Sequence, residues 1–383
     1  MPGRRYAFGQ VWRVATAAAA LTGATLHAQG GAHVTPSASL SQQYDTNVFS
    51  TPIAPEADLV TRATMGLEVE RRTQLWTASA SYLQDVERFA DHPDLSSAAA
   101  RQRGTMALRY RSSLRTSWVA DAEIWRTGTP SELNEATGIT VSRAAAQRLL
   151  GHTSVNRHLS QVTSGTIDYT VTQDHLAGRT SATTHEAIAA VERHRSRRDT
   201  VTVKYRFREF MFTPAAAGPT LASSSHAVTA GWSRAMNSRL QLTLEAGPRI
   251  TNTTPAADLA ASLHYQSVPD VSVSYVRSQA TVIGLPVVAD VQSLSTAIEW
   301  PLWSALRVRL APGLFRSQLG TASADACVVA LSVSRPMTHA VAVDLSISSN
   351  LQRGGLNPGL ANTSINRQVV LVRVIAGPSS LLW

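Results

Sequence analysis

The histidine and acidic residues of the chain do not form a local catalytic or metal-binding motif. His185 and Glu186 begin like the zinc motif HExxH, but His194 lies five residues beyond the position that would share their helix face. His264 stands alone, and the chain has no GxSxG segment, phosphate-binding loop or dinucleotide fingerprint. We therefore predict that the protein is not an enzyme and that it has no metal ligands and no cofactor.

Charged and polar residues instead alternate with apolar ones, which is the pattern of a β-strand with two unlike faces. In VTVKYRF (residues 201–207), the valines, the tyrosine and the phenylalanine share one face, and the polar residues share the other. Two segments alternate poorly: 139–155, and 183–195, for which a short amphipathic helix stays open beside a strand. The clear alternation recurs at 59–71, 75–86, 104–111, 118–124, 167–172, 240–246, 259–265, 271–278, 292–300, 305–316, 327–334, 341–347 and 368–376.

The connections between these segments are of two kinds. Tight polar turns occur near Arg72, Leu114, His158, Arg198, Asn237, Pro269, Trp303 and Met337. Roughly midway between them lie looser stretches, namely ADHPDLSS, TGTPSELNEAT, FTPAAAGPT, RITNTTPA, GLPVVAD, LGTASAD and NLQRGGLNPGL. The chain is therefore a series of hairpins with short turns at one end and longer loops at the other. The segments add up to about 18 strands, with about 16 as the fallback.

The N-terminus has the three parts of a secretory signal. Arginines precede an apolar run at residues 14–21, which is shorter than the roughly 20 residues needed to span a bilayer, and Ala28 is a small residue suited to signal peptidase. We predict a signal peptide at 1–28 and one mature domain at 29–383. Because Cys327 is the single cysteine, this exported domain has no internal disulfide, which suits a bacterial envelope.

An exported chain of alternating strands without a hydrophobic helix is typical of an outer-membrane β-barrel. Such barrels have strands of about 9–11 residues with apolar outer faces and polar inner faces, and closure leaves no backbone edge unpaired in lipid. We therefore predict an all-β fold, a transmembrane antiparallel β-barrel in the outer membrane, with both termini on the periplasmic side. A soluble all-β protein, such as a solenoid or a pair of sandwiches, is the alternative.

The first predicted hairpin is similar to the start of a known group of proteins. YDTNVF (residues 44–49), followed by a loop and ADLVTRATMGLEVERR (residues 57–72), resembles bacterial outer-membrane β-barrel porins, some of which are associated with exopolysaccharide or exosortase systems. Met65-Gly66-Leu67 stands where that group has a segment like Pro-Gly-Leu. The resemblance covers about 30 residues and implies architecture; it implies nothing specific about cargo.

The C-terminus departs from the pattern of that group, in which the last strand ends in an aromatic residue read by the insertion machinery. Trp383 is terminal, but Gly377 and Pro378 interrupt the alternation of QVVLVRVIA, because proline cannot donate to the strand ladder. We expect the final strand to end at about Ala376, with the aromatic residue on a short tail.

If the apolar faces meet lipid, the polar faces line a lumen. The predicted pore-lining residues are Arg62, Arg109, Arg111, Asp121, Glu123, Asp168, Lys204, Arg206, Arg208, Glu245, His264, Arg307, Arg309, Asp344 and Arg373. Glu68, Glu70 and Arg249 lie in the same phase. Two interpretations remain open: arginines that concentrate anions in a water-filled pore, or charges that pair across strands and fill the interior.

We therefore expect a porin-like channel or a secretion-linked pore, for small solutes or polysaccharide. A structural barrel with a plugged lumen is the alternative, and a Ser/His/Asp site assembled inside the barrel is supported by no local motif. The expected partners are outer-membrane lipid, the barrel-insertion machinery and, by the resemblance, exopolysaccharide export components. Nucleic acid is not expected, because the formal charge of +9 reflects arginines in an exported protein, three of them in the signal.

Overall fold

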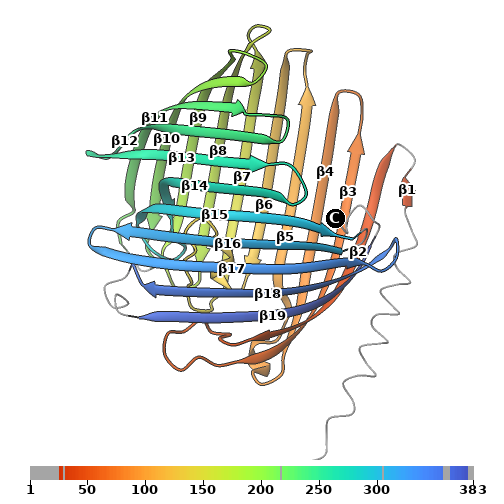
Figure 1. The fold of residues 1–383 in the computed structure, drawn as a ribbon. Helices are drawn as coiled ribbons and strands as arrows, with labels where there is room; N and C mark the ends of the chain where they lie inside the picture. Colours follow the sequence, from red (N-terminus) through yellow and green to blue (C-terminus); the bar gives the residue numbers. More distant parts are fainter. Residues whose placement is uncertain (1–25, 29–30, 216–217, 304–305, 357–362, 378–383) are drawn as a thin grey trace, which may run out of the picture.

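The computed structural model describes residues 26–28, 31–215, 218–303, 306–356 and 363–377. Within them the chain forms one antiparallel sheet that closes on itself (Figure 1). Its long strands are β2 (Ala32–Asp45), β3 (Asp58–Arg72), β4 (Trp76–Phe89), β5 (Ser97–Arg111), β6 (Thr116–Thr127), β7 (Ala146–His158), β8 (Thr163–Leu176), β9 (Ser181–His194), β10 (Asp199–Thr213), β11 (Leu221–Ala235), β12 (Leu240–Thr251), β13 (Thr254–Tyr265), β14 (Asp270–Thr281), β15 (Val288–Leu302), β16 (Leu306–Leu319), β17 (Ala322–Pro336), β18 (Val341–Gly354) and β19 (Ser364–Ala376). The remaining elements are β1 (Leu26–Ala28) and the short 3-10 helices η1 (Pro93–Leu95) and η2 (Pro130–Leu133).

The barrel closes where β19 pairs with β2, from Val369 opposite Asp45 to Ala376 opposite Ala38. Each of the 18 strands from β2 to β19 thus has two neighbours, and the predicted all-β barrel of that size is confirmed. In the part of the chain that the structure describes, no helix is long and apolar enough to cross a membrane. The last strand ends at Ala376, as its alternation predicts.

The two ends of the barrel differ, as the spacing of turn residues predicts. Turns of three or four residues, such as Thr73–Leu75 and Ser112–Arg115, join strands at one end, and longer connections such as residues 46–57 and 128–145 join them at the other. Two predicted loops were wrong: RITNTTPA and LGTASAD continue their strands into two-residue turns, Asn252–Thr253 and Gly320–Thr321. We call the two ends the turn end and the loop end; in barrels of this class the turn end is periplasmic.

The outward face of the strands is apolar. Its most exposed large side chains include Met65, Met106, Ile167 and Val203, which alternate with inward polar residues on the same strands. Near the turn end, Trp76, Tyr110 and Trp118 lie side by side on three neighbouring strands. Aromatic residues at this level are typical of a membrane interface, and the apolar outer face is what a closed barrel presents to lipid.

The two poorly alternating segments have different structures. Residues 183–195 lie mostly in β9, which pairs along its length with β8 and β10, so the strand interpretation is confirmed and the helix is excluded. Residues 139–155 are divided: 139–145 belong to the connection between β6 and β7, and β7 begins at Ala146. The alternation fails there because Ile139 is buried by contacts inside the barrel and lies in no strand.

The segment YDTNVF joins the first strand to the last. Asp45 accepts hydrogen bonds from Arg367 of β19, with Nη2 to Oδ2 at 2.6 Å and Nε to Oδ1 at 3.1 Å. Asn47 donates its side-chain amide to the carbonyls of Thr51 at 2.8 Å and Asn366 at 3.3 Å. Val48 is buried beside Val60 and Phe89. The polar positions of this segment therefore have a structural role, which is to fasten the seam that closes the barrel.

Most of the predicted signal peptide and the terminal Trp383 lie outside the described residues. The exception is β1, which pairs with Ala32–Val34 at the start of β2. Cleavage after Ala28 therefore stays a prediction.

Candidate functional site: the barrel lumen

The residues predicted to line a pore lie on the inward face of the strands. Alternation along each strand places them in phase with residues that contact a loop inside the barrel, such as Gln352 of β18 and Phe315 of β16. This holds for Arg62, Arg109, Arg111, Asp121, Glu123, Asp168, Lys204, Arg206, Arg208, Glu245, His264, Arg307, Arg309, Asp344 and Arg373. Their role in conduction stays a prediction.

Many of these charges are paired across strands. Lys204 lies 2.6 Å from Glu245, Arg373 lies 2.6 Å from Asp344, and Arg206 lies 3.0 Å from Glu186. His264, which the sequence shows as an isolated histidine, is 3.0 Å from Asp270. Lys204 of β10 reaches Glu245 of β12 past β11, whereas the other three pairs join neighbouring strands, where opposite charges stabilise the sheet. All four pairs contribute to the electrostatics of the lumen.

Toward the turn end, charged side chains of the lumen are exposed. There the inward side chains stay accessible: Arg309 is 60% exposed and Arg373 is 45% exposed. Arg109 and Arg111 lie on the half of β5 nearer the turn end. Within the described residues they make no ion pair, and both are exposed. An 18-stranded barrel is wide enough for an aqueous interior, and the exposure of these groups makes them accessible to water.

The loop end is narrowed by the connection between β6 and β7, residues 128–145, which we call the inner loop. Ile139 packs against Val291 of β15 and Ala324 of β17, on the opposite wall. The backbone N–H of Thr140 donates to Oε1 of Gln352 at 2.7 Å. Gly138 has φ of +63°, and a Cβ there would lie 2.6 Å from the Phe315 ring. The inner loop therefore crosses the lumen and is anchored on the far side.

The inner loop is also held at its origin by charges. Arg101 of β5 pairs with Glu132, and Thr127 donates its hydroxyl to the same carboxylate at 3.0 Å. Arg143 lies 3.5 Å from Glu87 and places its guanidinium 4.8 Å from the Phe89 ring centroid. Both ends of the crossing segment are thus fixed to the wall formed by β4 to β7.

A second element enters the lumen at the loop end: residues 278–290, the ends of β14 and β15, which we call the inner hairpin. Pairing between β13 and β14 stops at Leu259 opposite Arg277, and β15 pairs with β16 only from Asp290 onward, so the hairpin leaves the barrel wall between these two points. Its tip reaches the β8–β9 connection, where Gly284 bridges Thr180. The N–H of Ile283 donates to Oδ1 of Asn134 in the inner loop at 3.1 Å. The two inner elements therefore contact each other across the lumen.

A buried arginine joins the inner hairpin to the wall. Arg249 of β12 is 1% exposed, lies 2.6 Å from Asp258 of β13 and pairs with Asp290 of β15. Arg208 of β10 reaches the Gln279 carbonyl at 3.4 Å. Because β13 and β14 are unpaired at this level, these side-chain contacts take the place of strand hydrogen bonds across the gap between β13 and β14, which is a different place from the β2–β19 seam. We call Arg249, Asp258 and Asp290 the seam clasp.

Two outer loops are joined by His92. Its Nε2 lies 2.7 Å from Glu56 and its Nδ1 lies 2.8 Å from Asp58, so both ring nitrogens face carboxylates. The hydrogen bond with Glu56 and then that with Asp58 raise the pKa of His92 above its ordinary value. The imidazolium form therefore bridges residues 46–57 and 90–96 at the loop end.

The inner loop and the inner hairpin were not predicted as parts of the lumen. The available signal was composition: TGTPSELNEATGITVS contains Leu133, Ile139 and Val141, which are unusual in a solvent-exposed loop. The seam clasp could be predicted only in part from the sequence. Arg249 shares the phase of the pore-lining residues, but no sequence pattern indicates the inward bend that brings Asp290 to it.

Comparison with known proteins gives a likeness of fold. No protein-family model matches the chain. No curated protein matches its sequence. The outer membrane channel DcaP of Acinetobacter baumannii is 10% identical, with 92% of this chain and 99% of that chain covered and a TM-score of 0.45. OpdO of Pseudomonas aeruginosa is 9% identical, with 90% and 97% covered and a TM-score of 0.49. The siderophore receptor PirA from Pseudomonas aeruginosa is 7% identical, with 90% and 80% covered and a TM-score of 0.46.

The chain's own structure decides its location. A closed 18-stranded barrel with an apolar outer face and a polar interior gives each strand two hydrogen-bonded neighbours, as a lipid environment requires. The protein is a β-barrel of the bacterial outer membrane.

Proposed function

We propose that the protein is a porin-like channel for small hydrophilic solutes, with its narrowest part at the loop end. The observation that carries the proposal is the division of the lumen: exposed inward charges at the turn end, and the inner loop crossing the barrel at the loop end. A loop folded against the inner wall restricts the size of a permeating solute, while the charged wall above and below it replaces part of the solute's hydration.

The charges favour anions. Within the lumen, Arg109 and Arg111 carry charge that no described acid neutralises, and both are exposed to the aqueous interior. Most other inward charges are paired, and Glu68 is an inward acid with no ion pair among the described residues, so the positive excess is small and the preference is correspondingly mild. We therefore propose small anionic solutes as the preferred cargo class.

Planar-bilayer conductance of the purified, folded barrel tests the proposal. We expect discrete conductance steps and a reversal potential in a salt gradient that shows anion preference. Replacing residues 131–142 by a short Gly-Ser linker removes the part of the inner loop that crosses the lumen, so conductance should rise. Deleting Ile53 and Ala54, which lie in the exposed connection between β2 and β3, is the matched control and should leave conductance unchanged.

The same recordings separate the alternative, a structural barrel with a plugged lumen. If the native barrel gives no steps and the variant lacking the inner-loop crossing gives them, the inner loop is a plug and the native protein does not transport small solutes. If neither barrel conducts, the channel proposal fails.

A link to polysaccharide export stays a prediction from the resemblance of the first hairpin. Asp45 and Asn47 make contacts that close the barrel, so this segment bears on architecture and does not favour a polysaccharide over a small solute.

A further inference from the structure

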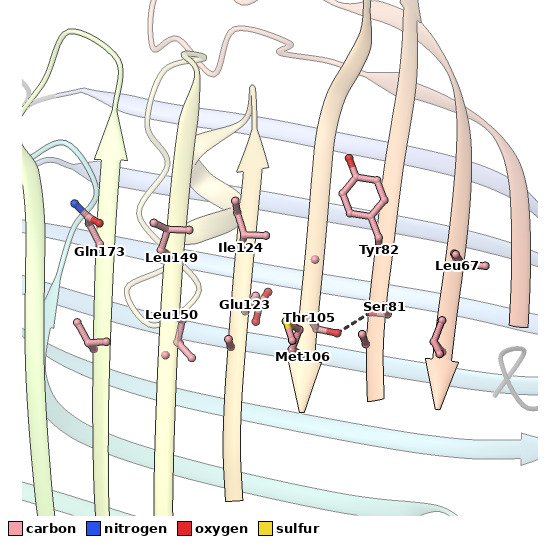
Figure 2. Close-up of a pocket in the computed structure, with 16 residues that line it drawn as sticks. Leu67, Ser81, Tyr82, Thr105, Met106, Glu123, Ile124, Leu149, Leu150 and Gln173 are labelled. Atoms are coloured by element: carbon pink, nitrogen blue, oxygen red, sulfur yellow. Dashed lines mark hydrogen bonds between the residues drawn. The ribbon is translucent and has the colours of Figure 1, made fainter. Parts of the chain in front are cut away.

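An apolar groove lies on the outer surface of the barrel, away from the lumen. It crosses β3 to β8, and its volume is about 680 Å³. Figure 2 shows Tyr82, Met106, Ile124 and Leu149 among the side chains around it, each from a different strand. The groove exists because small residues alternate with these large ones: Ala80, Gly104, Ala122 and Gly151 belong to the same outward rows.

The strand register places a polar row next to this groove on its loop-end side. Tyr82, Gly104, Ile124, Leu149 and Gln173 are consecutive partners across β4 to β8. Two residues farther along each strand, the outward positions are Gln84, Gln102, Arg126, Gln147 and His175. The outer surface thus changes within one row from mostly apolar side chains to amide and basic ones.

A second hollow of about 720 Å³ opens beside this polar row. Arg126, Gln102, Gln147 and His175 line it, and Asp94 is an acidic residue on its border. Arg126 uses Nε to donate to Gln147 at 3.1 Å, which holds the guanidinium at the edge of the hollow with its Nη groups available. His175 Nδ1 lies 2.8 Å from the Ser181 hydroxyl. The hollow therefore has fixed nitrogen donors.

The height of the polar row matches a lipid headgroup. Along β6, Arg126 lies eight residues from Trp118, which belongs to the aromatic row at the turn end. Eight residues of a tilted strand rise about 20 Å, and the apolar band of an outer-membrane barrel is about 25 Å tall. Arg126 thus lies near the interface of the leaflet on the loop-end side, where lipid phosphates are found.

We propose that the groove and the hollow together form a binding site for a phosphorylated lipid of the outer leaflet. An acyl chain would lie in the groove between Tyr82, Ile124 and Leu149, and the phosphate would meet Arg126 and His175 in the hollow. Arginine suits this task because its guanidinium forms two parallel hydrogen bonds to phosphate, and basic residues beside a membrane attract anionic headgroups. The hollow is also lined by Arg143 at the end of the inner loop, but its contacts with Arg126 and His175 lie on the outer surface, and the proposal does not depend on the proposed channel.

Native mass spectrometry of the detergent-solubilised barrel, titrated with diphosphoryl lipid A, tests the site. The double variant Arg126→Ala with His175→Ala should bind about tenfold more weakly, because charge-assisted hydrogen bonds are lost. Arg316→Ala is the matched control: Arg316 is also outward and exposed near the loop end, but Asp325 holds it through two hydrogen bonds of 2.7 and 3.1 Å. It should bind like the native barrel.

Two further measurements address the groove and the source of the phosphate. Ala122→Phe fills the groove without changing charge and should weaken lipid A binding. Inorganic phosphate in millimolar excess should not displace the lipid. The proposal is overturned if the double variant and Arg316→Ala bind equally, if Ala122→Phe has no effect, or if free phosphate displaces lipid A completely. Heat-modifiable gel mobility of each variant establishes that it is folded.

Discussion

A buried ion pair stabilises the closing seam between β2 and β19 in addition to the backbone pairing of the two strands, and its removal should destabilise the whole barrel. The Asp45 side chain is 3% exposed and the Arg367 side chain is 15% exposed, and hydrogen bonds of 2.6 and 3.1 Å join them. Asp45→Asn keeps the shape and removes the charge. Arg367 is then left inside the barrel without its carboxylate partner.

The expected loss of folding free energy follows from the burial of this ion pair. Removing one partner of a buried ion pair costs about 3–5 kcal/mol, because the remaining charge keeps its desolvation penalty. A loss of this size lowers the folding equilibrium constant by about two to four orders of magnitude. The control is Arg373→Ala. Arg373 is also on β19, and it pairs with Asp344 of β18. Because Arg373 is 45% exposed, we expect a loss of folding free energy of at most about 1 kcal/mol.

The assay is equilibrium unfolding in guanidinium chloride with tryptophan fluorescence, supported by heat-modifiable gel mobility at rising temperature. Asp45→Asn should unfold at a clearly lower denaturant concentration than the native barrel, and Arg373→Ala should stay close to it. Equal shifts for the two variants, or no shift for Asp45→Asn, would refute the argument that burial at the closing seam sets the energy.

Three further predictions concern the loop end. Arg249→Met removes the centre of the seam clasp and leaves two carboxylates facing each other, so the inner hairpin should be released; single-channel conductance should rise, and unchanged conductance would contradict the clasp. The bridge made by His92 has a raised pKa, so its contribution is complete below the ordinary value of 6.5 and is lost as pH rises through the raised value. Proteolysis of residues 90–96 should therefore increase with alkaline pH, and His92→Gln should abolish that dependence. Gly138→Ala should lower the thermal midpoint by strain at positive φ and contact with Phe315, whereas the same change at Gly178, which has open space around its Cβ position, should lower it less.

Much of the architecture could be predicted because it is local. Alternation with a period of two depends on the geometry of a single strand, so segments such as 201–207 predict both their conformation and their lipid-facing side. Turn residues near Leu114 and Asn237 predict where the chain reverses for the same reason. The inward phase of Arg206 or Asp344 follows directly from these two patterns.

The contents of the lumen depended on contacts between residues far apart in the chain. Ile139 meets Val291 and Ala324 only because the closed barrel brings opposite walls within reach of the inner loop. The pairing of β13 with β14 stops at Leu259 opposite Arg277, and beyond that point the inner hairpin is held by Arg249 and by packing across the lumen. A strand's own periodicity determines which way its side chains point, whereas the space into which they point exists only after all 18 strands have closed.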